Sequence, residues 1–327
     1  MTHPDAGRDE QLPTAGGGWP ALPGGTVDRR TFDELFTRLS AWGRWPNADR
    51  GAWNRQTAAT TLAAVRSVRN GRTVQMALPW NTEPAPDNHK PALHLMSDLG
   101  DREPPEPSTN KDFIGVDYHG KASSHLDALA HIAYRGELFD GRRSREVVDA
   151  TGAGFGSVGS LRHYVGRGVL VDLPAVNGVD WLEPGDPVHA ADILRAEERG
   201  GFRIGEADAV LLRTGHKHRR NRLGPWDSSD SSAGLHVSAM PLLADRGIAV
   251  LGGDGDSDMR PSPTPGIHSP IHILAITAMG VPLLDNLDLE ELSAVCAQEQ
   301  RYEFLFVVAP LNVPRGTGSP VNPIAIF

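Results

Sequence analysis

Cysteine is almost absent from this sequence, since Cys296 is the only one in 327 residues. A single cysteine cannot form an internal disulfide, which fits a protein kept in a reducing cytoplasm. Cys296 falls in a helical pattern over residues 289–298, where we expect a buried, unreactive thiol. Long apolar runs are also missing: no stretch approaches the ~20 residues of a membrane helix, and residues 1–18 lack the apolar core of a signal peptide. We therefore expect a soluble cytoplasmic protein with no membrane partner.

Positive charge is scarce as well. The chain has 41 acidic and 32 basic residues, and its formal net charge is −9. Nucleic-acid binding needs a concentrated basic surface, and the densest basic stretch, residues 217–222, is short and contains no aromatic side chain. We interpret that stretch as a solvated loop. The expected partner is a small-molecule substrate and not a nucleic acid.

Glycine and proline are plentiful, at 36 and 26 residues, which predicts many turns. Residues 1–25 combine them with charged side chains and predict a flexible N-terminal arm. Residues 26–327 suffice for a single domain with a sizeable core. A capping-box pattern predicts a helix from Thr31, a second helical pattern covers residues 58–70, and residues 79–107 have the composition of a long loop.

Three short apolar runs have the composition of buried strands, and a helical pattern at residues 188–200 lies between the first two. The runs are residues 168–173, 208–215 and 248–254. Strand, helix and strand in this order predict an α/β fold.

Histidine and aspartate are concentrated in one short segment, which contains His119, His125, Asp127 and His131. In an extended chain alternate side chains share a face, so His125 and Asp127 would point the same way with Leu126 turned into the core. Imidazole beside carboxylate suits zinc, manganese or iron, and the lack of cysteine ligands argues against a purely structural zinc site. His131 would reach the same pocket if the chain turned into a helix there, which makes it a candidate general base.

A second histidine and carboxylate pair lies far along the chain. A helix beginning at His272 would hold its imidazole at the N-terminal end, and the apolar run after Gly280 predicts a strand that ends at Asp285. These two side chains could complete the coordination shell begun by His125 and Asp127. The alternative for Asp285 is an exposed turn before the next helix.

Residues 124–131 resemble the second half of the signature of the metal-dependent cyclase family, which includes bacterial kynurenine formamidases and isatin hydrolases. That signature is His-x-Gly-Thr-His-x-Asp-x-Pro-x-His, and here Leu129 stands at the proline position. Lys121 stands where the family has its leading metal-binding histidine. Either His119, two residues earlier, takes over that role, or the position is lost or remodelled.

The resemblance extends from about Trp42 to the C-terminus, including a closing segment at residues 316–323. In the family the region around residue 270 carries a histidine and a downstream glutamate that bind metal, and His272 and Asp285 match them. The resemblance implies an α/β domain with a mixed, partly barrel-like sheet and surrounding helices, of the swivelling β/β/α type. It also implies a homodimer or homotetramer in which neighbouring subunits shape each pocket.

Our first functional hypothesis is a metal-dependent hydrolase that opens an amide, cyclic amide or lactone bond of a small substrate. A zinc or manganese ion on His125, Asp127 and His272, with His119 and Asp285 as further ligands, would lower the pKa of a bound water, and His131 would move its proton. The candidate substrate-binding residues are Trp80, His236 and Asp254.

Two other hypotheses stay open. The same residues could serve a metal-assisted cyclase or dehydratase of natural-product metabolism, because a metal site also stabilises an enolate. The chain could also be a non-catalytic ligand-binding homologue in which the ammonium of Lys121 replaces a lost cation. The sequence does not identify the substrate, the metal or the number of metal ions.

Overall fold

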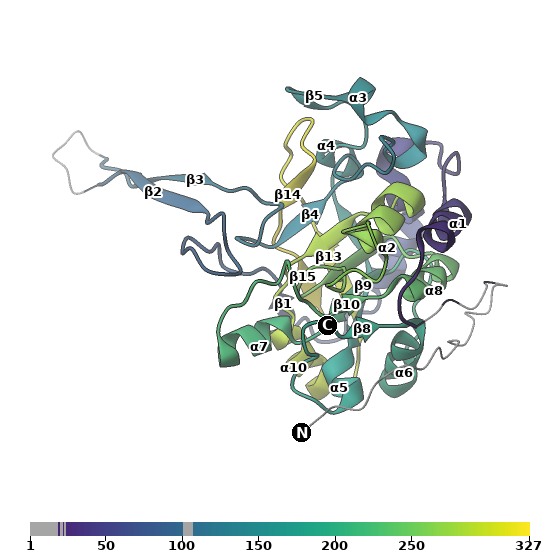
Figure 1. Cartoon of the computed structure of the whole chain (residues 1–327). Coiled ribbons are helices and arrows are strands. Elements are labelled where there is room, and N and C mark those ends of the chain that lie inside the picture. The colour runs from purple at the N-terminus through teal and green to yellow at the C-terminus, as the bar shows by residue number, and fades with distance from the viewer. Residues whose placement is uncertain (1–18, 20–21, 23, 101–106) are drawn as a thin grey trace.

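A curled, mixed sheet of nine strands forms the centre of the computed structural model, which describes residues 19, 22, 24–100 and 107–327 (Figure 1). The predicted flexible arm, residues 1–25, lies almost entirely outside the described residues. In spatial order the strands are β1 (Thr73–Gln75), β15 (Ile324–Ile326), β13 (Glu303–Val308), β7 (Tyr164–Asp172), β9 (Ala209–Arg213), β11 (Val250–Gly253), β12 (Leu283–Asp285), β4 (His125–Asp127) and β14 (Gly318–Pro320).

The four central strands, β7, β9, β11 and β12, are parallel, and the strands on both sides of them are antiparallel to their neighbours. The three apolar runs of the sequence correspond to β7, β9 and β11. The predicted α/β class with a mixed, partly barrel-like sheet is therefore confirmed.

Both faces of the sheet are covered, so its central strands contribute to two cores. Val169 and Val171 of β7 pack on one side, and Leu170 between them packs on the other. The first core also receives side chains from α1 (Arg29–Leu39), α6 (Ala190–Gly200), α8 (Met240–Arg246) and the π-helical segment η4 (Ile273–Met279), and the second from α10 (Glu290–Glu299). Burial on both faces explains why these strands are continuous apolar runs in the sequence.

The first helix differs from its prediction in its cap. Helix α1 begins at Arg29, two residues before the predicted start at Thr31, because the Asp28 carboxylate accepts a hydrogen bond from the Thr31 backbone N–H at 2.8 Å. Helix α2 (Ala58–Val65) begins as predicted but ends before residue 70. Just after the end of the helix, the Ser67 hydroxyl donates a hydrogen bond to the Ala64 carbonyl of the last turn at 2.6 Å.

The basic stretch at residues 217–222 is a helix, α7 (His216–Leu223), and the loop prediction was wrong. Its beginning is fixed from a distance, because the carboxylate of Asp254 accepts hydrogen bonds from the backbone N–H groups of Gly215 and His216 at 2.8 and 3.0 Å. A carboxylate at a helix N-terminus is stabilising. Sequence patterns within the helix do not reveal a cap that lies about forty residues away.

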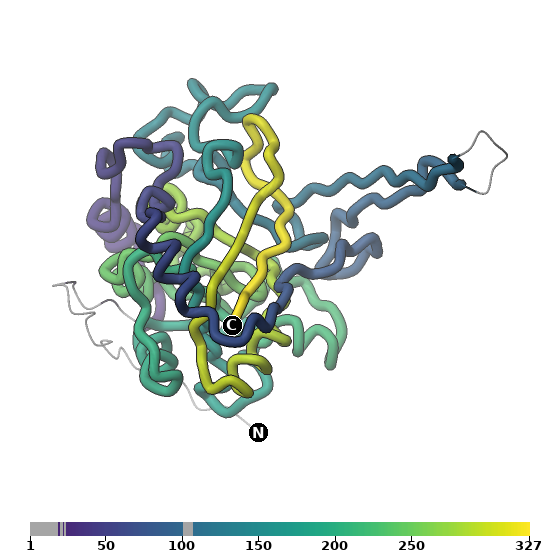
Figure 2. The backbone as a smooth tube through the Cα atoms, turned by 180° about the vertical axis from the view of Figure 1, so that it is seen from behind, coloured from purple at the N-terminus to yellow at the C-terminus, as the bar shows by residue number. Residues whose placement is uncertain are grey.

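The predicted long loop at residues 79–107 contains a strand that the sequence did not indicate. Strands β2 (Leu93–Asp98) and β3 (Lys111–Gly115) pair as an antiparallel hairpin that projects from the body of the molecule, and Figure 2 shows this arm from the opposite side (Figures 1 and 2). At its base the Lys90 ammonium lies 2.7 Å from an Asp117 carboxylate oxygen. We call β2 and β3 the hairpin arm.

The remaining elements are short. They are η1 (Ala48–Arg55), η2 (Phe139–Gly141), α3 (Ser144–Val147), β5 (Val148–Asp149), β6 (Gly152–Ala153), α4 (Val158–Leu161), α5 (Leu173–Asn177), β8 (Pro187–Val188), β10 (Gly234–Leu235), η3 (Val237–Ala239) and α9 (Pro270–His272). Within the described ranges, no helix is long and apolar enough to cross a membrane.

Candidate metal centre

Strand β4 supplies the first two side chains of the site. His125 and Asp127 point to the same side of the sheet and are only 3% and 1% exposed, while Leu126 between them is fully buried in the second core. This is the alternation that the sequence predicted for an extended segment. Pairing of β4 with β12 on one edge and β14 on the other holds both side chains in place.

Asp285 joins them from the neighbouring strand. In the antiparallel pairing of β12 with β4, Asp285 lies directly opposite His125, so the two side chains are on the same face. Asp285 is 4% exposed, and the Ser257 hydroxyl donates to its carboxylate at 2.8 Å. The alternative of an exposed turn at Asp285 is therefore wrong.

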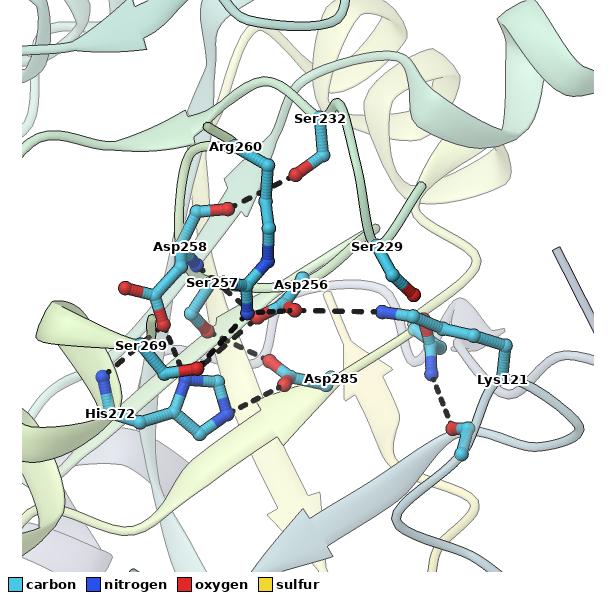
Figure 3. Close-up of polar contacts among 12 residues, drawn as sticks. Lys121, Ser229, Ser232, Asp256, Ser257, Asp258, Arg260, Ser269, His272 and Asp285 are labelled. Carbon is cyan, nitrogen blue, oxygen red and sulfur yellow. Dashed lines mark hydrogen bonds and ion pairs between the residues drawn. The ribbon is translucent and has the colours of Figure 1, made fainter. Parts of the chain in front are cut away.

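His272 comes from α9 and closes the cluster. Its Nε2 lies 3.3 Å from Asp285 Oδ2 (Figure 3). The same atom lies 3.5 Å from Asp127 Oδ2, so two segments far apart in the sequence meet here. The structure thus places the imidazoles of His125 and His272 around the same carboxylate, Asp127, at 3.7 and 3.5 Å.

His119 and His131 form the outer side of the site. Their rings are stacked with centroids 3.8 Å apart, and His131 Nε2 lies 3.8 Å from Asp127 Oδ2. The chain reaches His131 through a turn after Ala128 and not through the expected helix. His119 Nδ1 is 2.7 Å from Asp127 Oδ1, and its Nε2 is 2.9 Å from the hydroxyl of Thr317, which belongs to the predicted closing segment.

Asp127 is the electrostatic centre of this group. Burial would raise the pKa of its carboxyl, but the surrounding imidazoles, first His125 and then His119 and His272, hold that pKa well below the ordinary value. Its Oδ2 is buried and accepts no hydrogen bond among the described residues. Burial lowers the pKa of His131 to about 4, so this ring is neutral near pH 7.

The sequence analysis missed the carboxylate that orients His272. Asp258, in the loop after β11, lies 2.6 Å from His272 Nδ1 and accepts the Ile271 backbone N–H at 2.6 Å. A carboxylate can only accept, so Nδ1 carries a proton and, in the neutral ring, Nε2 keeps a free lone pair directed at the cluster. The available signal was the alternation of aspartates at 254, 256 and 258 after a buried strand.

The donor atoms fit a metal ion. Asp127 belongs to two groups of three potential ligands, and the ligand atoms within each group lie within 4.8 Å of one another. Asp127 Oδ2, which has no hydrogen-bond partner among the described residues, is the acceptor that a cation would satisfy. The groups are His119, His125 and Asp127, and Asp127, His272 and Asp285. Imidazole and carboxylate donors of this kind suit zinc, manganese or iron.

Lys121 lies in the wall of this site but outside both donor groups. The cavity beside the cluster has a volume of about 330 Å³ and is also lined by Lys90, Asp117, Asp256 and Arg260. The Lys121 ammonium faces Asp256 Oδ2 at 3.7 Å (Figure 3). Of the two residues considered for the family's leading ligand position, His119 is therefore the one placed among the potential metal ligands.

The three predicted substrate-binding residues have different surroundings. Trp80 and Asp254 line a second cavity of about 420 Å³ that shares Lys121 with the first. Asp254 is buried, and its oxygens are occupied by backbone N–H groups of residues 214–216 and the Thr214 hydroxyl. His236 is in neither cavity; it bonds Ser238 and the Gly25 carbonyl.

Known proteins resemble this chain in sequence and in fold. A family described as "Putative cyclase" matches residues 53–257. The crystal structure of a novel cyclase has 26% sequence identity and a TM-score of 0.81, covering 89% of this chain and 99% of that chain.

Isatin hydrolase structures share the fold at lower identity. Isatin hydrolase A from Ralstonia solanacearum has a TM-score of 0.57 at 20% identity, covering 83% of this chain and 98% of that chain. Isatin hydrolase A from Labrenzia aggregata, bound to benzyl benzoate, has a TM-score of 0.55 at 22% identity, covering 78% and 93%. No curated protein matches the sequence significantly. Because the family match spans more than half of the chain, this protein belongs to the cyclase family.

Proposed function

We propose that this protein is a metal-dependent hydrolase that opens an amide, cyclic amide or lactone bond of a small substrate. The observation that carries the proposal is Asp127 Oδ2, a buried carboxylate oxygen with no hydrogen-bond partner among the described residues. It lies between His272 Nε2 at 3.5 Å and His131 Nε2 at 3.8 Å. The shared fold with isatin hydrolases supports hydrolysis as the reaction class.

The residues of the site have two roles: some would bind the metal ion, and others position those metal-binding side chains. His125, Asp127 and His272, with Asp285 and His119, would hold a zinc or manganese ion. Such an ion, when bound, acts as a Lewis acid on a carbonyl oxygen and lowers the pKa of water.

Three contacts keep the proposed metal-binding side chains in position. Asp258 fixes the tautomer of His272, Ser257 donates to Asp285, and Thr317 contacts His119. Outer contacts of this kind tune the orientation and basicity of metal ligands.

His131 is the candidate for proton transfer. Its ring is neutral near pH 7 and partly exposed to the cavity, so one nitrogen can accept a proton from a water molecule and return it to the leaving nitrogen or oxygen. Stacking on His119 fixes the plane of the ring.

The test combines metal analysis with a substrate screen. The protein is purified without added metal and analysed for zinc and manganese, and then assayed on N-formyl arylamines, cyclic amides such as isatin, and lactones. Reaction in ¹⁸O-labelled water separates hydrolysis, which incorporates the label, from cyclisation or dehydration, which does not. A protein that binds no metal after reconstitution with either ion would contradict the proposal.

His131→Ala distinguishes a proton carrier from a ligand. We expect turnover to fall by about 10²- to 10⁴-fold, the usual contribution of general acid–base catalysis, with the metal content unchanged. Loss of metal from this variant would instead make His131 a ligand. Lys90→Ala, on the exposed rim of the same cavity, is the matched control and should retain activity.

We also propose that the protein is a homodimer or a homotetramer and that the hairpin arm contacts a second copy. Leu93, Leu95 and Phe113 lie on one face of the arm and are 57%, 58% and 54% exposed. A two-stranded hairpin alone is marginally stable in water, and such an apolar patch is typical of an interaction surface.

The location of the arm favours another copy of this chain as the partner. Lys90 and Asp117, at the base of the arm, also line the cavity beside the metal donors, so a subunit packed on the arm would shape that cavity. Light scattering of the wild type and of Leu95→Ser/Phe113→Ser is the test. A monomeric wild type would exclude the proposal.

A further inference from the structure

Lys121 is the charged residue that joins the two cavities. The first lies beside the metal donors, the second is lined by Trp80 and His216, and Lys121 is in the wall of both. Its side chain is only 23% exposed. A substrate large enough to enter both cavities would therefore pass the ammonium group.

The Lys121 ammonium is poorly satisfied by the protein. In the described part of the chain its ion-pair partner is Asp256, at 3.7 Å, and the ammonium donates no hydrogen bond to a protein acceptor. Asp256 is already bound by the Arg260 guanidinium at 2.9 Å, and Figure 3 shows it between these two cations. An ammonium has three N–H donors, and those of Lys121 are left for solvent or for a bound ligand.

The other cations of the second cavity differ in this respect. The Lys217 ammonium lies 3.4 Å from Asp288, and the Arg220 guanidinium makes a two-pronged contact with Asp87. Each has a carboxylate of its own, whereas Lys121 shares one. The positive charge at the junction is thus the one that a bound anion would complement.

The second cavity offers flat walls beside that charge. His216 packs against Trp226 with ring centroids 4.5 Å apart, and Trp80 is a partly exposed wall residue. Burial, together with the nearby charge of Lys121, lowers the pKa of His216 to about 3, so its ring is uncharged. Aromatic side chains of this kind favour planar, apolar groups.

We propose that Lys121 is a specificity residue that binds a carboxylate of the substrate at the junction of the two cavities, with a planar body of the substrate against Trp80 and His216. This inference rests on the proposed function, because it assigns a substrate group to the same site. It narrows the substrate class to small planar molecules that carry a carboxylate beside the bond to be opened.

The experiment measures binding and does not depend on turnover. Benzoate and benzamide have the same shape but differ in charge, and their dissociation constants are measured by calorimetry with the full-length protein as purified and after chelation of metal. We expect benzoate to bind at least about tenfold more tightly than benzamide in both preparations, as expected for a charge-assisted hydrogen bond.

Two variants locate the preference. In Lys121→Met, which keeps an unbranched side chain one atom shorter and removes the charge, the preference for benzoate should disappear, and Lys121→Arg should retain part of it. Arg30→Met removes an exposed cation that already has Glu34 at 2.9 Å and that lines neither cavity, and it should bind both probes as the wild type does. Circular dichroism verifies that each variant is folded.

Equal benzoate preference in the wild type and Lys121→Met would overturn the inference. So would a preference that vanishes in the chelated wild type, because the metal would then be the carboxylate's partner. Failure of the proposed function would give a different result. The protein would bind no metal or show no hydrolysis, while the chelated protein would still prefer benzoate.

Discussion

The metal-donor cluster and the hairpin arm are both built on short strands, but they differ in what surrounds those strands. His125 and Asp127 are at most 3% exposed because β4 is paired on both edges and lies inside the main sheet. Leu93 and Leu95 are more than half exposed, in a sheet of two strands. The comparison shows that paired neighbours on both edges fix and bury the side chains of a strand, whereas a strand in a separate hairpin leaves its side chains exposed.

Asp127→Asn should have the largest effect in this comparison. It removes the carboxylate shared by both donor groups, and we expect metal affinity to fall by more than the 10- to 100-fold typical of an outer-shell change. Metal titration followed by elemental analysis is the measurement. The matched control is Asp98→Asn on the hairpin arm, whose carboxylate pairs with Lys111 at 3.0 Å and which should keep full metal content. Equal loss of metal in both variants would show that the effect is not specific to the donor cluster.

Asp258→Asn should have a smaller effect, because in the proposed site Asp258 orients the ligand His272 and is not among the residues proposed to hold the metal. The amide can accept the His272 N–H but carries no charge, so we expect about 10- to 100-fold weaker metal binding with a folded protein. Competition with a chelator of known affinity measures this change. Unaltered affinity would show that the peptide backbone alone positions His272.

Leu126→Ala and Leu95→Ala give the mildest test of the contrast. Leu126 is fully buried in the second core, on the face of β4 opposite His125 and Asp127, and its truncation should lower the free energy of unfolding by about 2–5 kcal/mol. Leu95 is 58% exposed, so the same change should stay within about 0.5 kcal/mol. Urea unfolding of both variants at low protein concentration gives the difference. A large loss of unfolding free energy in Leu95→Ala would indicate that a second subunit covers the hairpin arm even at low protein concentration.

The sequence was sufficient for the parts of the site that depend on local geometry. An extended segment places residues two apart on one face, so the pairing of His125 with Asp127 and the burial of Leu126 followed directly from the pattern. The apolar runs of the central strands were recognisable because strands buried on both faces lack polar alternation. Cys296 is buried as expected, and burial raises the pKa of its thiol to about 12.

The parts that were missed depend on contacts between distant residues. Helix α7 was predicted as a loop because its cap, Asp254, comes from another strand end. The hairpin arm was not predicted because its strands lie in or beside a polar, proline-rich region. These strands do not pack on a core, so their sequence carries no clear alternation of buried and exposed residues. Asp258 was overlooked because only the position of His272 reveals what its carboxylate is for.

By itself, the sequence determined the α/β class, the facing pair on β4 and the two segments that could supply metal donors. The tertiary structure decided that these segments meet, that Asp285 faces His125 across two strands, and that Lys121 turns to Asp256 and not to the donors. The reason is physical: the period of a strand is a property of the backbone, whereas the meeting of side chains from distant segments depends on the register and packing of the whole sheet.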